Sequence, residues 1–306
     1  MGNYYVKRII SAIGTILIIA TVTFIIMKVI PGGPFTRERP VSPEILENLE
    51  KKYNLDDPVY IQYLNYMKGL VQFKLGPSFK WLGRDVEDLI AAGFPTSAKI
   101  GGLASIVIIS IGIPIGIISA LKSNSPLDYF VMFLATLGVT LPSFVIATGI
   151  IYYFGGQWDL LPTHGLDSWK GYIGPVIALS GYSLSFVSRL TRSSMLEVLR
   201  QDYVRTARAN GISEFKVIAK HALKNALIPV ITYVGPMVAA ILTGSFVIEK
   251  VFALDGMGRY FVESVGARDY TVIVGMTVFY ATFYVIMIVL VDFGYSIVDP
   301  RIKLKG

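Results

Sequence analysis

The stretch "IGGLASIVIISIGIPIGIISAL", residues 100–121, contains no charged residue over its 22 positions. A helix rises about 1.5 Å per residue, so this stretch would reach roughly 33 Å, enough to cross a hydrocarbon core of about 30 Å. Two further stretches also lack charges, Tyr129–Trp158 with 30 residues and Thr271–Val291 with 21. Three such stretches in one chain predict a protein that crosses a membrane several times.

The composition agrees with a membrane protein. Of the 306 residues 53% are hydrophobic and only 16% are charged, whereas soluble domains carry about 25% charged residues. We predict an all-α polytopic membrane protein with six transmembrane helices, at residues 8–30, 98–121, 129–154, 172–188, 228–248 and 271–291. The apolar run of the first span exceeds the roughly 7–15 residues of a secretory signal, so we expect this span to be retained.

The distribution of basic residues predicts the orientation. Six spans place both termini on one side of the membrane. Segments 1–7, 122–128, 189–227 and 292–306, with Arg8 counted at the boundary, hold 14 Lys and Arg residues, whereas the short loops 155–171 and 249–270 on the other side hold four. Cytoplasmic loops carry the excess of Lys and Arg, so both termini are expected in the cytoplasm.

The predicted orientation divides the chain into parts. Residues 1–30 form the N-terminus and first span, 31–97 a small external helical domain, 98–291 a core of five spans with the cytoplasmic loop 189–227, and 292–306 a tail. Three short helices are expected in the external domain, starting at Ser42-Pro43 and at Asp57-Pro58 and running over Arg84–Ala92 up to Gly93. They could cover the span ends or form a docking surface for an external partner.

A basic stretch before the fifth span, "RTARANGISEFKVIAKHALKNALIP" at residues 205–229, has its own pattern. Apolar spacing predicts a helix over 194–209, which Asn210-Gly211 ends because glycine accepts a left-handed conformation. Ser213 is the expected cap of a second helix. Its apolar stripe would comprise Phe215, Ile218, Ala219, Ala222, Leu223 and Ala226, and its polar stripe Lys216, Lys220 and Lys224.

Two interpretations of this stretch stay open. Residues 214–227 suit a helix that lies in the membrane interface, with lysines on anionic headgroups. A sharp corner over 200–213 is not needed for that role. A corner that projects from the bilayer suits contact with a soluble cytoplasmic partner.

The chain lacks the residues of several kinds of site. It contains no G-x-x-x-x-G-K-[ST] motif, no cysteine, and only two histidines, His164 and His221. Charges at membrane depth are few, and Lys28 and Asp292 lie at span ends. Ion-coupled transporters, in contrast, tend to carry ionisable groups near the midplane. We therefore expect no catalytic residue, no metal and no cofactor in this chain, and we attribute its net charge of +7 to topology rather than to nucleic acid.

Uncharged polar residues mark the third and fourth spans. The candidates for lining a pathway are Thr136, Thr140, Ser143, Ser180, Tyr182 and Ser183. Ser and Thr at such spacing commonly pack helices together. The alternative is a wet lining that offers hydrogen bonds without a fixed charge.

Several stretches resemble one family over essentially the whole chain. They are "PGGPF" (31–35), "GPSFK" (76–80), "AAGFPTS" (91–97), "TLPSF" (140–144), "LPTHG" (161–165), "SRLTRSSMLEVLRQDYVRTARANG" (188–211), "HALKNALIPVIT" (221–232), "DGMGRYFVESVGARDYTVIVG" (255–275) and "DPRI" (299–302). The chain resembles the B-type permease of oligopeptide and dipeptide ABC importers, with "PGGPF" and "GPSFK" more similar to the oligopeptide branch.

The resemblance implies a fold, a location and partners. The fold would be that of a type I ABC importer permease, in a bacterial-type cytoplasmic membrane. The partners would be a second homologous permease, two cytoplasmic ATPase subunits that bind ATP and magnesium, an external substrate-binding protein and a peptide substrate. A dipeptide, nickel or another small solute is the alternative cargo within the family.

The resemblance also implies that the corner contacts an ATPase. The residues concerned are Arg205, Arg208, Ala209, Asn210, Gly211, Ile212, Ser213 and Glu214. The general importer signature begins with Glu-Ala-Ala, whereas this chain has Arg205-Thr206-Ala207, so a contact through that glutamate is absent here. A self-contained secondary transporter or channel is the rival from another class. An intramembrane enzyme would need paired carboxylates or a Ser/His or Ser/Lys dyad at membrane depth.

Overall fold

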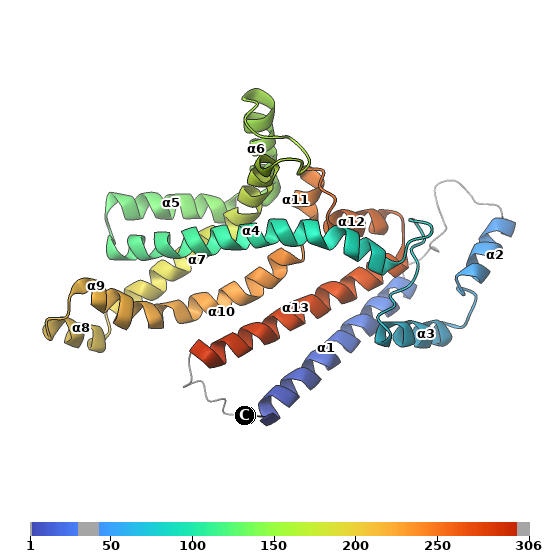
Figure 1. Cartoon of the computed structure of the whole chain (residues 1–306), viewed down its shortest axis with the longest axis horizontal. Helices are drawn as coiled ribbons and strands as arrows, with labels where there is room; N and C mark the ends of the chain where they lie inside the picture. The colour runs from blue at the N-terminus through green and yellow to red at the C-terminus, as the bar shows by residue number, and fades with distance from the viewer. Residues whose placement is uncertain (1, 30–42, 299–306) are drawn as a thin grey trace. The chain divides into compact units, whose positions relative to one another are not determined.

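The computed structural model describes residues 2–29 and 43–298 (Figure 1). The predictions for "PGGPF", for the Ser42 cap, for "DPRI" and for residues 299–306 of the tail concern positions outside the described residues. The side chain of Asp292 is not described either. The chain divides into two compact units, one formed by residues 1–96 with 255–306 and the other by Ser97–Leu254.

Long apolar helices dominate both units, which confirms the predicted all-α membrane class. Within residues 2–29 and 43–298, five segments are long and apolar enough to cross a bilayer, namely Val6–Val29, Val86–Leu121, Trp169–Leu199, Glu214–Val251 and Tyr270–Leu290. They contain the helices α1 (Gly2–Val29), α4 (Val86–Leu121), α7 (Ile173–Leu199), α10 (Leu223–Leu242) and α13 (Tyr270–Val298). A sixth crossing requires a bent pair of helices.

The third predicted span, residues 129–154, is a bent pair of helices in the structure and not one continuous helix. The chain bends by 101° between helix α5 (Pro126–Thr140) and helix α6 (Ser143–Ile150). Helix α6 continues as a π-helix over Ile151–Gln157. Leu141 at the break is extended, with φ −78° and ψ 123°. Proline lacks an N–H and disfavours helical backbone in the residue before it, so Pro142 accounts for the break.

Helix α7 lies at the centre of the second unit, where it packs on α5, α6 and α10. Helix α4 approaches it so closely that a Cβ on Gly116 would lie 2.5 Å from the Ser188 carbonyl oxygen. The four serines that make the fourth span less hydrophobic, Ser180, Ser183, Ser185 and Ser188, are all buried. These serines pack against other helices, so the low hydropathy of this segment does not argue against a membrane span.

A buried ion pair joins the start of α5 to α7. The Asp128 side chain is 1% exposed and accepts from Arg192 twice, at 2.6 Å from Nε and 2.7 Å from Nη2. Ser119 Oγ and the Asn124 backbone N–H also donate to this carboxylate. Every oxygen of the buried charge is therefore hydrogen-bonded, as a buried ion pair requires.

The first unit contains helices from both ends of the described chain. Helices α1 and α13 pack on each other, and α12 (Met257–Gly266) packs on α13. Helices α2 (Pro43–Lys52) and α3 (Val59–Val71) follow α1 along the chain, and α3 starts directly after Pro58 as predicted.

The predicted end of a third external helix at Gly93 is wrong, because α4 runs unbroken from Val86 to Leu121. Gly93 has a packing role instead. A Cβ at this position would lie 2.8 Å from the Met257 backbone nitrogen, so glycine lets α4 and α12 approach each other. Whether residues 31–97 lie outside the membrane stays a prediction.

The "GPSFK" loop is held by a carboxylate that lies 189 to 191 residues further along the chain. Asp269, which is fully buried, accepts through Oδ2 from Ser78 Oγ at 2.6 Å and from the Phe79 and Lys80 backbone N–H groups at 2.9 Å. Ser78 Oγ in turn accepts from the Trp81 N–H at 2.9 Å. Two stretches of the family resemblance, "GPSFK" and "GARDY", thus form one hydrogen-bonded corner.

Replacing Asp269 by asparagine should destabilise this corner by about 2 kcal/mol, because hydrogen bonds to a charged group are the stronger ones. Thermal unfolding of the purified chain in detergent measures the loss. Asp56→Asn, at an exposed position, is the matched control and should leave the midpoint unchanged. Equal midpoints for the two variants would contradict a structural role for the Asp269 carboxylate.

Candidate functional site

The basic stretch forms a compact corner, but it starts differently from the prediction. Helix α7 ends at Leu199 and α8 runs over Asp202–Ala209, so a single helix over 194–209 is wrong. Gln201 between them is extended, with ψ 147°. The turn lets α8 bury Val204 and Ala207 against Val217, with Val198, Leu199 and Ile212 packed around them.

Gly211 ends α8 in the predicted way. Its φ is +75°, a region that glycine occupies without strain, and its N–H donates to the Arg208 carbonyl oxygen at 3.0 Å. A Cβ added at Gly211 would have no heavy atom within 4 Å. The backbone conformation, and not lack of space, is therefore the reason for glycine here.

An ion pair closes the corner on its exposed side. Arg208 donates to both carboxylate oxygens of Glu214, at 3.0 Å from Nε and 2.6 Å from Nη2. The hydrogen bond to Glu214 raises the pKa of Arg208. Ser213 stands at the cap position of α9 (Glu214–Lys216) as predicted, but its side chain makes no capping hydrogen bond.

The apolar stripe of the second helix is only partly as predicted. Phe215 is 81% exposed and Ala219 is exposed, whereas Val217, Ala222 and Ala226 are buried. Residues Val217–Ala222 form a π-helix, whose wider turn shifts the register of the following side chains. The polar stripe of Lys216, Lys220 and Lys224 is exposed, as expected.

The corner is also tied to the fifth span. Asn225 Nδ2 donates to the Tyr203 hydroxyl at 2.7 Å, which joins α8 to α10. Helices α8 and α9 lie side by side at the end of α7 (Figure 1). Of the eight residues predicted to contact an ATPase, all are exposed except Ile212, which is half-buried.

The six pathway candidates do not form one group. Ser180 and Ser183 are buried, Ser143 is half-buried, and Thr136, Thr140 and Tyr182 are exposed. Ser180 Oγ donates to the Val176 carbonyl oxygen at 2.6 Å and lies 3.4 Å from the Ala104 carbonyl oxygen on α4. Ser180 thus fits the helix-packing alternative, whereas the exposed hydroxyls of Thr136 and Thr140 bond to carbonyl groups of their own helix.

The sequence alone does not predict the ion pair of Asp128 and Arg192. Its partners lie 64 positions apart, and Arg192 reads as one more basic residue of a cytoplasmic loop. A signal was present in Asp128, an acid at the start of a long charge-free stretch.

Comparison with known proteins identifies the family. Residues 112–304 match the binding-protein-dependent transport system inner membrane component, and residues 1–97 match its N-terminal part. The chain is 49% identical to the dipeptide transport system permease protein DppB of Bacillus subtilis over 99% of both chains. It is 41% identical to the oligopeptide transport system permease protein OppB of Salmonella typhimurium, over 99% of this chain and all of that protein.

A solved structure supports the fold. An inward-facing structure of the MetNI methionine ABC transporter has a chain that aligns with a TM-score of 0.54 at 19% identity, covering 69% of this chain and 95% of that one. The likeness supports the fold alone, because the sequences have diverged widely. The chain belongs to the family of inner membrane components of binding-protein-dependent transport systems, the ABC importer permeases.

Proposed function

We propose that this chain is one of two permease subunits in an ATP-driven importer of peptides, and that it is coupled to the ATPases through the corner at residues 205–214. The observation that carries the proposal is the exposed corner itself, which buried apolar contacts and the ion pair of Arg208 with Glu214 hold in one conformation. A braced corner can transmit a push from a soluble partner, whereas a loose loop would absorb it.

The proposed mechanism is alternating access. Two cytoplasmic ATPase subunits bind ATP with magnesium and close on each other, and they move the corner of each permease. Helices α7 and α10, which enter and leave the corner, carry this motion into the spans. The two permeases then open towards an external binding protein, receive its peptide, and return after hydrolysis.

The proposed orientation places the corner and both termini in the cytoplasm. Support comes from the excess of Lys and Arg on that side. The exposed lysines Lys216, Lys220 and Lys224 can contact anionic headgroups beside the docked partner.

The proposed cargo is an oligopeptide, on the likeness of "PGGPF" and "GPSFK" to that branch. Dipeptides are the second candidate, because the DppB relative is 49% identical whereas the OppB relative is 41% identical. Uptake of a labelled pentapeptide, in competition with unlabelled dipeptide and pentapeptide, decides between them.

Cysteine cross-linking tests the coupling role, because the chain has no cysteine of its own. We expect Asn210→Cys to cross-link to an ATPase subunit in the assembled complex and to react with thiol reagents only from the cytoplasm. Lys170→Cys, in a loop predicted to lie outside, is the control and should not cross-link. Peptide uptake by the chain alone under an ion gradient would instead support a secondary transporter.

A further inference from the structure

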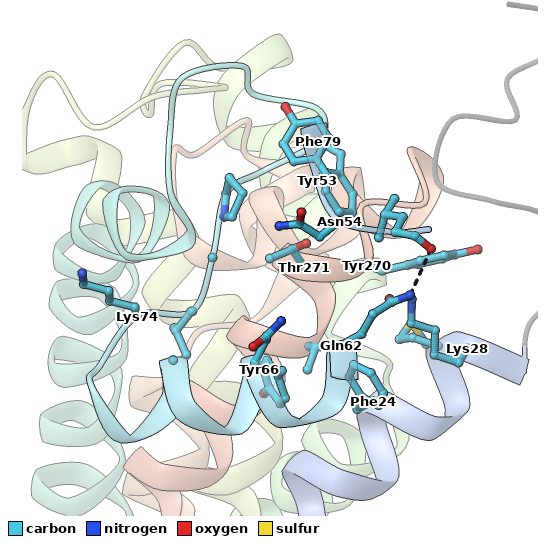
Figure 2. Close-up of a pocket in the computed structure, with 18 of the residues that line it drawn as sticks. Phe24, Lys28, Tyr53, Asn54, Gln62, Tyr66, Lys74, Phe79, Tyr270 and Thr271 are labelled. Atoms are coloured by element: carbon cyan, nitrogen blue, oxygen red, sulfur yellow. Dashed lines mark hydrogen bonds between the residues drawn. The ribbon is translucent and has the colours of Figure 1, made fainter. Parts of the chain in front are cut away.

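The first unit contains a cavity of about 360 Å³ that the coupling role does not use (Figure 2). Its volume falls within the roughly 300–1,000 Å³ of small-ligand sites. Side chains from α1, α3, the loop after α3 and the start of α13 line it, including Phe24, Lys28, Tyr66, Lys74 and Thr271. The cavity is thus built from segments far apart in the sequence.

Positive charge distinguishes this cavity. Lys28, Lys52 and Lys74 line it, and none of its described lining residues is acidic. None of these lysines forms an ion pair with a carboxylate among residues 2–29 and 43–298. Lys28 Nζ donates to Gln62 Oε1 and also lies 5.8 Å from the Phe24 ring centroid, so its position is defined.

An unsatisfied hydroxyl adds a neutral donor. The Tyr66 hydroxyl oxygen is buried and has no hydrogen-bond partner in the described part of the chain. Burial raises the pKa of Tyr66, so the hydroxyl keeps its proton. The Tyr66 ring stacks on Phe24 with centroids 5.7 Å apart, which holds the hydroxyl in place. Buried polar groups in native proteins usually have a hydrogen-bond partner. The Tyr66 hydroxyl therefore has room for an acceptor that the described chain does not supply.

The position of the cavity indicates a lipid rather than a soluble anion. Lys28 lies in the last turn of α1, at the end of the apolar segment Val6–Val29. Helix α3 beside it exposes Tyr60, Leu64 and Val71, at 66%, 60% and 78% exposure. A helix with exposed aromatic and aliphatic side chains next to a span end lies at the level of the headgroups. The apolar lining from Phe24, Met27 and Val274 can accommodate the start of an acyl chain.

We propose that this cavity binds the headgroup of an anionic phospholipid, in the leaflet away from the N-terminus. Lys28 contacts the phosphate, Tyr66 donates a hydrogen bond to it, and the aromatic rings contact the glycerol and the first methylene groups. Lys52 and Lys74 are exposed and add positive charge around the site, and the Lys74 side chain points away from Lys28 and Tyr66 (Figure 2). The role is independent of coupling at Gly211. It would anchor α3 to the end of α1 through a lipid that both contact.

Native mass spectrometry of the full chain in the detergent-purified complex tests the proposal. Dioleoyl phosphatidylglycerol, dioleoyl phosphatidylcholine and inorganic phosphate are titrated separately. We expect phosphatidylglycerol to bind at least tenfold more tightly than phosphatidylcholine, because a lysine near an anionic headgroup contributes about 1 kcal/mol and three line the site. Equal affinity for the two lipids would overturn the proposal, and so would displacement of phosphatidylglycerol by equimolar inorganic phosphate.

Variants locate the binding to the cavity. Lys28→Gln should weaken phosphatidylglycerol binding about fivefold. Tyr66→Phe, which removes only the hydroxyl, should weaken it by a similar factor of about five. Lys68→Gln on α3 is the matched control, because Lys68 is exposed and does not line the cavity. An effect of Lys68→Gln as large as that of Lys28→Gln would show a diffuse surface attraction and refute the site.

Discussion

Replacing Arg192 by alanine should destabilise the second unit by about 3–5 kcal/mol, because it leaves the buried Asp128 carboxylate without its cation. Asp128 is 1% exposed, so water cannot replace the lost partner without opening the packing of α5 on α7. Ser119 and the Asn124 N–H would remain as donors, but neither carries a charge. Removal of one member of a buried pair is far more costly than removal of a surface ion pair.

Thermal unfolding in detergent measures this loss, and a fall of about 10 °C in the midpoint is expected for a chain of this size. Arg189→Ala is the matched control, because Arg189 lies on the same helix and is exposed. The double variant Asp128→Asn with Arg192→Gln should recover part of the stability, since no unpaired charge stays buried. A midpoint for Arg192→Ala within about 2 °C of that of Arg189→Ala would contradict the stabilising role of the pair.

The ion pair also offers a route by which the proposed motion of the corner could reach other helices. Arg192 lies on α7 seven residues before the end of that helix, and Asp128 lies in the first turn of α5. In the proposed mechanism, a displacement of α7 would be passed to α5, and hence to the bend at Pro142, through a contact that resists separation. We expect a folded Arg192→Lys variant to transport less peptide while ATP hydrolysis is preserved. Lysine keeps the positive charge but cannot form the two parallel hydrogen bonds that arginine makes to the carboxylate.

Five of the six predicted spans correspond to long apolar helices in the described residues, and the third corresponds to a bent pair. The positions could be predicted because charges are costly in lipid, so charge-free stretches mark the spans along the chain. The fourth span shows the limit of that argument. Its serines lower the hydropathy, and only the structure shows that Ser180, Ser183, Ser185 and Ser188 face neighbouring helices. Hydropathy measures transfer into lipid, not into a protein interior.

Local rules failed where tertiary packing overrides them. Glycine often ends a helix, yet α4 continues through Gly93. Here glycine is needed for packing, because a Cβ would collide with the backbone of α12. The π-helix over Val217–Ala222 likewise exposes Phe215, which regular helical spacing places on the buried stripe. At Gly211, in contrast, the backbone conformation is a local property, and the prediction from residue type is confirmed.

Replacing Gly211 by aspartate should abolish ATP-driven peptide uptake while the chain still folds and inserts. The structure explains why folding survives, because a Cβ at this position would have no heavy atom within 4 Å. Asp and Asn occupy positive φ more readily than other side chains, so the backbone penalty is about 1 kcal/mol. The damage is expected at the surface that faces the proposed partner, where a new carboxylate would be desolvated.

The matched control is Gly211→Asn, which has the same shape and the same tolerance of positive φ but no charge. A desolvated, unpaired charge at an interface costs about 2–5 kcal/mol, so coupling of the aspartate variant should fall by at least about 30-fold. Uptake of labelled peptide and ATP hydrolysis are measured together in vesicles that contain the whole complex. We expect the aspartate variant to lose uptake, with hydrolysis no longer stimulated by the loaded binding protein, and the asparagine variant to keep a substantial part of both. Because Gly211 lies on the exposed side of a braced corner, uptake within twofold of normal in the aspartate variant would mean that force enters this chain elsewhere.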